Sequence, residues 1–240
     1  MSEIISTPIA YQVENQTFEG VLVYQENQSA ARPGILIAPN WMGVTDGAIE
    51  QAKGVAAQGY VVLVADLYGQ GKRPTNADEA GALMTEVINT PAEVGRMQAA
   101  LETLVAQKTA AVDGSKLAAA GFCFGGHCAL DLARSGADIK AAISFHGTLN
   151  TLKTHTAGQI KASLLVLDGA EDPLVPREQL SGFVSEMNAA SVDWQLVSYA
   201  GAVHSFTDPG ANVEGVAKYH PEVAKRAFAQ MYALLKHVFN

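Results

Sequence analysis

The chain has few charged residues, few cysteines and no long apolar run, and each shortage excludes a class of protein. Charged residues make up only 17% of the sequence and hydrophobic residues 48%, a balance that argues against disorder and predicts a packed core. The 16 basic residues are outnumbered by 24 acidic ones, so a basic nucleic-acid-binding surface is not expected. The longest apolar runs, such as Tyr60–Ala65, are far too short to span a membrane. The first residues also lack a basic and an apolar segment of the secretory type, so we expect a soluble, cytoplasmic protein without a membrane partner.

The two cysteines are Cys123 and Cys128. On one helix their Cα atoms would lie roughly 8 Å apart, which is a poor geometry for a disulfide. Two unpaired thiols fit a reducing compartment. The cysteines form no zinc pattern and no two histidines have metal-ligand spacing with a carboxylate, so no metal site is expected.

Apolar runs and helical segments alternate along the whole chain, without a repeat or an obvious linker. We expect strands at Phe18–Tyr24, Gly34–Pro39, Tyr60–Asp66, Lys116–Phe122, Ala141–Phe145, Leu164–Leu167 and Trp194–Tyr199. We expect helices at Asp46–Gln58 (with Asp46 as cap), Ala77–Ile88, Ala92–Gln107, from just after Cys123 to about Arg134, Arg177–Ala189 and Pro221–Val238. This alternation predicts a single α/β domain over residues 1–240, with a mostly parallel sheet covered by helices on both faces. Ligand sites in such sheets lie at the carboxyl ends of the strands.

The sharpest motif is Gly121-Phe122-Cys123-Phe124-Gly125-Gly126, between a predicted strand and a predicted helix. This G-x-C-x-G pattern is a cysteine version of the nucleophile elbow, in which small flanking residues let strand and helix approach closely. The helix N-terminus lowers the pKa of a thiol, and the Phe124 N–H would point into an oxyanion hole. Taken alone, the motif is equally consistent with a buried cysteine in a glycine-rich turn.

A cysteine nucleophile needs a base and a group that orients the base, and in this fold their order is nucleophile, acid, histidine. Asp172 lies in an acidic loop after the strand Leu164–Leu167, and His204 follows the last strand. Both should meet Cys123 at one edge of the sheet. We prefer Asp172 to Asp168, which is too close to its strand, and Glu171 is the main competitor.

At this point the sequence resembles the dienelactone hydrolase family, which has the α/β-hydrolase fold, from about Phe18 to the closing helix. The resemblance rests on GILIAPNWMG, VVLVADLYGQG, GFCFGG, GAEDPLVP and GAVHSF. It implies a triad of Cys123, Asp172 and His204, an oxyanion hole from the backbone N–H groups of Trp41 and Phe124, and ester or lactone hydrolysis without a cofactor or metal. The expected partner is a small ester or lactone, and the expected state is a monomer or small homo-oligomer.

The chain departs from the family pattern at two positions. Members that act on dienelactone carry a glutamate where this chain has Asn40, and that glutamate holds the resting cysteine as a thiol. Asn40 cannot exchange that proton, so the alternative is a resting thiolate–imidazolium pair. Those members also place an arginine soon after the histidine to bind a substrate carboxylate, whereas this chain has Thr207 and Asp208. A carboxylate there would repel an anionic substrate, so we do not expect dienelactone itself to be the substrate.

Further residues are expected to line the substrate pocket: Asn40, Met42, Phe122, His146 and Phe206. A rival hypothesis is a class I glutamine amidotransferase, which pairs the same type of elbow with a downstream His-Pro-Glu, here His220-Pro221-Glu222. Proline and glutamate in the first turn of a helix are ordinary capping choices, which weakens this hypothesis. A non-catalytic binding or redox-sensing protein with an oxidisable Cys123 is the third hypothesis.

Overall fold

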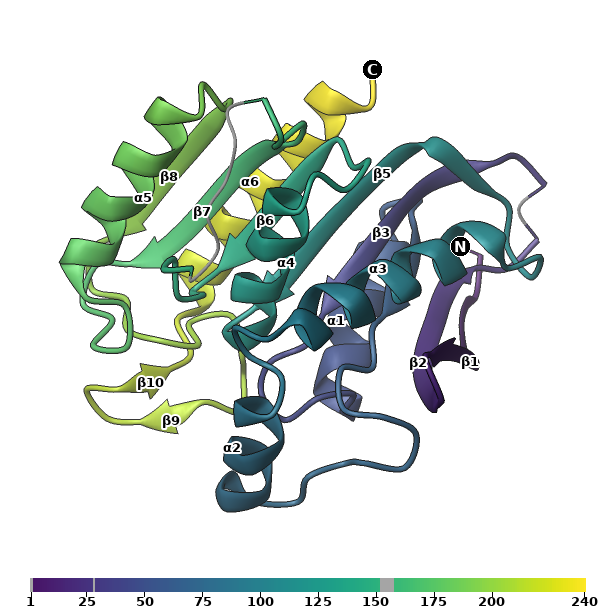
Figure 1. The fold of residues 1–240 in the computed structure, drawn as a ribbon, viewed down its shortest axis with the longest axis horizontal. Coiled ribbons are helices and arrows are strands. Elements are labelled where there is room, and N and C mark those ends of the chain that lie inside the picture. The colour runs from purple at the N-terminus through teal and green to yellow at the C-terminus, as the bar shows by residue number, and fades with distance from the viewer. Residues whose placement is uncertain (1, 28, 152–157) are drawn as a thin grey trace. The chain divides into compact units, whose positions relative to one another are not determined.

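A computed structural model describes residues 2–27, 29–151 and 158–240, and its main feature is a mostly parallel sheet (Figure 1). The sheet has eight strands in the order β1-β2-β4-β3-β5-β6-β7-β8. Contacts along the chain define two compact units, Met1–Ala119 and Ala120–Asn240, and the division falls within β5. The predicted α/β fold with a mostly parallel sheet is therefore confirmed.

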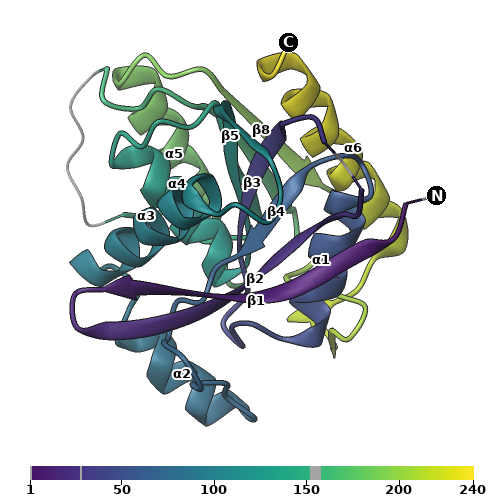
Figure 2. The same ribbon diagram turned by 90° about the vertical axis from the view of Figure 1, so that its right-hand side faces the viewer.

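The first unit combines an antiparallel hairpin with parallel strands. Its strands are β1 (Ile4–Val13), β2 (Gln16–Gln25), β3 (Arg32–Ala38), β4 (Val61–Val64) and most of β5 (Val112–Phe122), and its helices are α1 (Asp46–Ala56), α2 (Ala77–Thr85) and α3 (Pro91–Ala106). Figure 2 shows β1 and β2 as a long hairpin, paired from Ile4–Gln25 to Val13–Gln16. β2 is antiparallel to β4, and β3 is parallel to β4. Every residue of β4 is buried, which explains why it reads as a continuous apolar run.

The second unit holds the parallel strands that follow the elbow. It contains the end of β5, then β6 (Ala141–Phe145), β7 (Ser163–Gly169), β8 (Trp194–Tyr199), β9 (Asn212–Val213) and β10 (Ala217–Lys218), with helices α4 (Phe124–Arg134), α5 (Arg177–Ala189) and α6 (Pro221–Val238). β6, β7 and β8 are parallel neighbours. Both α4 and α6 pack against β6, one in front of the strand and one behind it in Figure 1. Parallel strands buried on both faces bring their carboxyl ends to one edge.

Most predicted elements have their counterparts, and the differences are local. The N-cap of α1 is Thr45, whose hydroxyl accepts a hydrogen bond from the Ala48 N–H, and not Asp46, which is the first helical residue. α2 ends at Thr85, three residues before the predicted end at Ile88, and a turn leads from there to Pro91. β1, β9 and β10 were not predicted.

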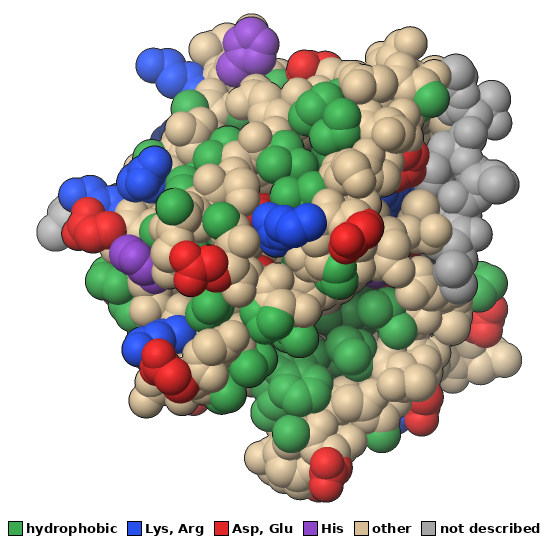
Figure 3. Space-filling model, turned by 90° about the vertical axis from the view of Figure 1, so that its left-hand side faces the viewer, with side chains coloured by type: hydrophobic (Ala, Val, Ile, Leu, Met, Phe, Trp, Pro, Cys, Tyr) green, Lys and Arg blue, Asp and Glu red, His purple; other side chains and the backbone are tan. Residues whose placement is uncertain are grey.

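Few large apolar side chains of the described residues are exposed on the surface. Figure 3 shows one face, where hydrophobic side chains lie among acidic and basic ones. Among the residues that the structure describes, the exposed large hydrophobic ones are Val105, Leu174, Val213, Val216 and Tyr219. No helix of the described residues is both long enough and apolar enough to span a membrane.

Candidate active site

Cys123 lies at the turn between β5 and α4, in a backbone conformation that residues with a side chain rarely adopt. Its φ is 56° and its ψ is −118°, and strain of this kind costs on the order of 1–3 kcal/mol at a non-glycine residue. The surrounding glycines are sterically required. A Cβ on Gly121 would lie 1.9 Å from the Gly125 carbonyl oxygen, and one on Gly126 would lie 2.6 Å from the Ser144 hydroxyl. This is the steric pattern expected of a nucleophile elbow.

The two thiols differ in their surroundings. Cys123 is partly exposed and Cys128 is buried, and neither forms a disulfide. Cys123 immediately precedes Phe124, the first residue of α4. Cys123 is therefore at the N-terminal end of the helix, where the helix dipole is positive. A partly exposed thiol at a helix N-terminus is the environment in which cysteines react.

His204 and Asp172 form a buried pair in the second unit. The His204 Nδ1 lies 2.8 Å from a carboxylate oxygen of Asp172, and each residue is 4% exposed. The other Asp172 oxygen accepts a hydrogen bond of 2.8 Å from the Leu174 N–H. The carboxylate is therefore held by its own loop and fixes the orientation of the imidazole.

The His204 ring is electrostatically coupled to Cys123 as well as to Asp172. Burial disfavours the charged ring, but the interactions with Asp172 and Cys123 outweigh it and raise the pKa of His204 to about 10. The buried Nε2 has no partner of good hydrogen-bond geometry among the described residues. The sulfur is thus close enough to influence the ring without being aligned with it, a common state of such pairs before substrate binds.

A short hairpin, which was not predicted, supports the backbone of His204. The His204 N–H donates to the Val216 carbonyl over 3.1 Å, and the His204 carbonyl accepts from the Lys218 N–H over 3.0 Å. These bonds form a parallel bridge between His204 and Ala217, at the start of β10. The histidine is therefore held on a fixed backbone.

The other acids of the Asp172 loop are occupied elsewhere. Asp168 accepts two hydrogen bonds from the Arg177 guanidinium, over 2.7 and 3.1 Å, and one from the Ser198 hydroxyl over 2.7 Å. Glu171 is exposed and accepts from the Gly201 N–H over 3.2 Å. Of the three acids weighed in the sequence, Asp172 is the one that contacts the His204 ring.

The other histidines include His220, the histidine of the amidotransferase hypothesis. His220 is the N-cap of α6, and its Nδ1 accepts from the Val223 N–H over 3.4 Å, while Glu222 is exposed in the first turn. His220 thus has the capping role expected from its sequence context. His127 is buried within α4 and His237 is exposed on α6. His155 lies outside the described residues.

The predicted pocket residues fall into two groups. Phe122 and Phe206 are 3% and 0% exposed, and Phe122 stacks on Phe145 with 4.8 Å between ring centroids. His146 is buried against the His204 ring, with 5.1 Å between centroids. A role in the substrate pocket stays a prediction for all three.

Asn40, Trp41 and Met42 belong to the first unit, in the loop after β3. The Asn40 side chain accepts from the Met42 N–H over 2.9 Å, and the Trp41 carbonyl accepts from the Tyr68 hydroxyl over 2.7 Å. The oxyanion role of Trp41 and the pocket roles of Asn40 and Met42 stay predictions.

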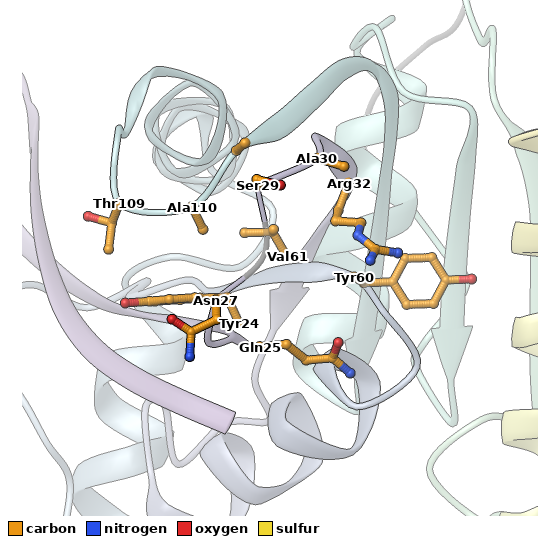
Figure 4. A pocket seen from close by; sticks show the side chains of 11 residues that line it. Tyr24, Gln25, Asn27, Ser29, Ala30, Arg32, Tyr60, Val61, Thr109 and Ala110 are labelled. Atoms are coloured by element: carbon orange, nitrogen blue, oxygen red, sulfur yellow. The ribbon is translucent and has the colours of Figure 1, made fainter. Parts of the chain in front are cut away.

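A separate cavity of about 350 Å³ lies wholly within the first unit (Figure 4). Its polar lining includes Arg32, Tyr24 and Tyr60, and it contains no cysteine or histidine. It therefore has no group capable of the nucleophilic chemistry described above.

The sheet topology, the strained elbow and the acid–histidine pair after β7 and β8 together define an α/β-hydrolase. The family model of the dienelactone hydrolase family matches residues 18–239. The chain therefore belongs to the dienelactone hydrolase family and is a hydrolase of the ester and lactone type.

Individual proteins are similar to this chain in sequence or in structure. An uncharacterized protein of Caenorhabditis elegans is 38% identical over 149 residues, which are 60% of this chain and 92% of that protein. The solved structure of a protein named m3DLH is 38% identical, covers 99% of both chains and has a TM-score of 0.93. A dienelactone hydrolase-like promiscuous phosphotriesterase from metagenomic libraries is 35% identical, covers 98% of both chains and has a TM-score of 0.91.

Proposed function

We propose that the protein hydrolyses uncharged carboxylic esters or lactones through a covalent thioester on Cys123, with His204 as acid and base and Asp172 as the orienting group. The observation that carries this proposal is the coupling of one buried imidazole to both other groups. His204 lies 2.8 Å from Asp172, and its pKa is raised to about 10 in part by Cys123.

A raised histidine pKa favours a thiolate–imidazolium pair in the resting enzyme. At neutral pH a ring with a pKa near 10 is protonated, and its charge stabilises the thiolate that attacks. This agrees with Asn40 in place of a glutamate, since a permanent ion pair needs no carboxylate to take the thiol proton.

The first step forms the bond between the Cys123 Sγ and the carbonyl carbon. The carbonyl oxygen becomes an oxyanion. In the second unit, the backbone N–H of Phe124 is the proposed hydrogen-bond donor to this oxyanion. The C–O bond to the alcohol then breaks, and the leaving oxygen takes a proton from His204. One oxyanion donor typically lowers such a barrier by about 3–4 kcal/mol.

The second step uses the neutral His204 as a base. It takes a proton from water, whose oxygen bonds to the thioester carbon, and the C–S bond breaks to release the acid and the thiolate. Asp172 keeps the Nδ1 proton in place, so that Nε2 faces the reacting groups in both steps.

The test is turnover of p-nitrophenyl acetate, followed by mass spectrometry of the acylated protein. Cys123→Ser and Asp172→Asn should each lose at least about a hundredfold in kcat, as expected for members of a catalytic unit. His204→Ala should accumulate an acyl adduct on Cys123. A phosphotriester in the substrate panel would show whether the activity named for one structural relative occurs here.

Two matched controls separate the alternatives. Glu171→Gln and His220→Ala change the competing acid and the competing histidine, and both should keep nearly full esterase activity. Ammonia release from glutamine that depends on His220 and not on His204 would favour the amidotransferase. Absence of multiple turnover on any ester, lactone or thioester would contradict the proposal.

A further inference from the structure

His146 is a second buried imidazole at the site, and the reaction proposed above does not use it. It directly follows β6, is 2% exposed and has a φ of 43°. A left-handed conformation is uncommon for a residue with a side chain and is maintained only where the surrounding structure enforces it.

Both nitrogens of the His146 ring are engaged. The Nδ1 accepts a hydrogen bond from the backbone N–H of Cys123 over 3.2 Å. The Nε2 lies 2.8 Å from the Thr207 hydroxyl oxygen. Because Nδ1 is an acceptor, the ring proton is on Nε2 and is donated to Thr207, which fixes a single neutral tautomer.

The same ring contacts the histidine proposed as base. Its centroid lies 5.1 Å from that of His204, with an interplanar angle of 66°, and 5.0 Å from that of Phe206, with an angle of 82°. The Cys123 N–H also donates to the Phe145 carbonyl over 2.9 Å. The His146 ring therefore connects the peptide of the nucleophile to the segment His204–Thr207.

We propose that His146 is a positioning residue, which sets the placement of the His204 ring relative to the Cys123 sulfur by binding the Cys123 N–H on one side and Thr207 on the other. This proposal rests on the proposed function, in which that placement governs proton transfer. An error of 1 Å in such a placement can lower a rate about a hundredfold.

The His146 ring keeps this tautomer only while the ring is neutral. Burial and the nearby charge of His204 hold the pKa of His146 well below its usual range. Among the described residues of the second unit, the titratable side chain in contact with the ring is that of His204, which is paired with Asp172, while Cys123 contacts the ring through its backbone N–H. A second charge on His146 would oppose the charge on His204.

The experiment compares four variants by ester kinetics and by the pH dependence of Cys123 alkylation with iodoacetamide. His146→Leu removes both hydrogen bonds. His146→Asn keeps an acceptor near the Nδ1 position and tolerates the left-handed backbone. Thr207→Val removes the acceptor for Nε2, and His237→Asn is the matched control on the exposed end of α6.

His146→Leu should lower kcat by about ten- to a hundredfold with KM changed less than about threefold, and should shift the alkylation midpoint to higher pH. Thr207→Val should shift the midpoint in the same direction. His146→Asn should restore part of kcat relative to His146→Leu, and His237→Asn should match the parent protein.

An unchanged alkylation profile in His146→Leu or, if that variant does not fold, in Thr207→Val would overturn the proposal, because a purely structural role would lower only the melting temperature. If the proposed function is wrong, the measurements would give a different result. In that case the parent protein would not turn over esters, while the alkylation profiles would still report whether His146 controls Cys123.

Discussion

At the scale of single residues, the site depends on one imidazole whose proton is stabilised by two neighbours. The pKa of His204 is raised from 6.5 to about 10. A histidine whose pKa is higher in the folded state than in the unfolded state stabilises the folded protein. The stabilisation is complete at pH values below the pKa of the unfolded state, and it is lost as the pH rises through the pKa of the folded state.

The protein should therefore lose stability between about pH 6.5 and about pH 10 because of His204. Urea unfolding across this range should show a free energy of unfolding that falls more steeply with pH in the parent protein than in His204→Gln. Parallel curves for the two proteins would mean that the imidazole has no raised pKa in the folded state.

The elbow provides a second prediction at this scale. Gly121→Ala places a Cβ 1.9 Å from the Gly125 carbonyl oxygen. This steric overlap with the backbone should lower the free energy of unfolding by about 3 kcal/mol or more. Gly54→Ala is the matched control, because nothing lies within 4 Å of its Cβ. Gly54 lies in the helix α1, where replacing glycine by alanine should raise the free energy of unfolding by about 1 kcal/mol. Equal melting temperatures for the two variants would contradict the steric account of the elbow.

At the scale of elements, the β9–β10 hairpin connects the site to the surface. Of the five large hydrophobic residues that are exposed in the described part of the chain, three lie on this segment: Val213, Val216 and Tyr219. Val216 also accepts the backbone hydrogen bond of His204. Apolar side chains on a hairpin whose backbone is bonded to His204, the proposed base, are suited to contact an apolar part of an ester substrate.

The double variant Val213→Ser/Val216→Ser should weaken binding of a butyryl ester more than of an acetyl ester. Each buried CH₂ contributes about 0.8 kcal/mol, so the ratio of the two KM values should change about fourfold or more, while kcat stays similar. Val105→Ser, an exposed valine of α3, is the control. Unchanged chain-length preference would show that the hairpin does not bind the acyl group.

The elements also show which features a sequence reveals. Buried parallel strands such as β4, and helices with a clear start signal such as α6, which begins at Pro221, follow from local patterns. β1 was not predicted because Ile4–Val13 contains Pro8 and, of its ten residues, only Tyr11 is buried, as is typical of an edge strand. β9 and β10 have two residues each, too few for any periodicity.

The part of the site that could be predicted from the sequence is the part that lies at the carboxyl ends of parallel strands, because these ends meet at one edge of the sheet. The pairing of His204 with Asp172 follows from their positions after β8 and β7. The bonds of His146 to Cys123 and Thr207 could not be predicted, because they depend on a left-handed backbone that no local pattern indicates for histidine. The support of His204 by the hairpin likewise depends on an element too short to recognise.

At the scale of the whole molecule, the formal net charge of −8 acts on any charged substrate. Long-range repulsion lowers the encounter rate with anions and is screened by salt. The value of kcat/KM for an ester that carries a carboxylate should therefore rise with ionic strength, whereas that for a neutral ester of the same size should stay constant. Identical salt responses would exclude an electrostatic basis for substrate selection.

The loop that carries Asp172 has one further consequence. Arg177, at the first residue of α5, donates to the Asp168 carboxylate and to the Gly169 and Val175 carbonyls. These bonds link the two ends of the loop that contains Asp172, the proposed orienting acid. Warming cannot release this acid before β7 and α5 separate, so heat inactivation should coincide with global melting of the second unit and not precede it.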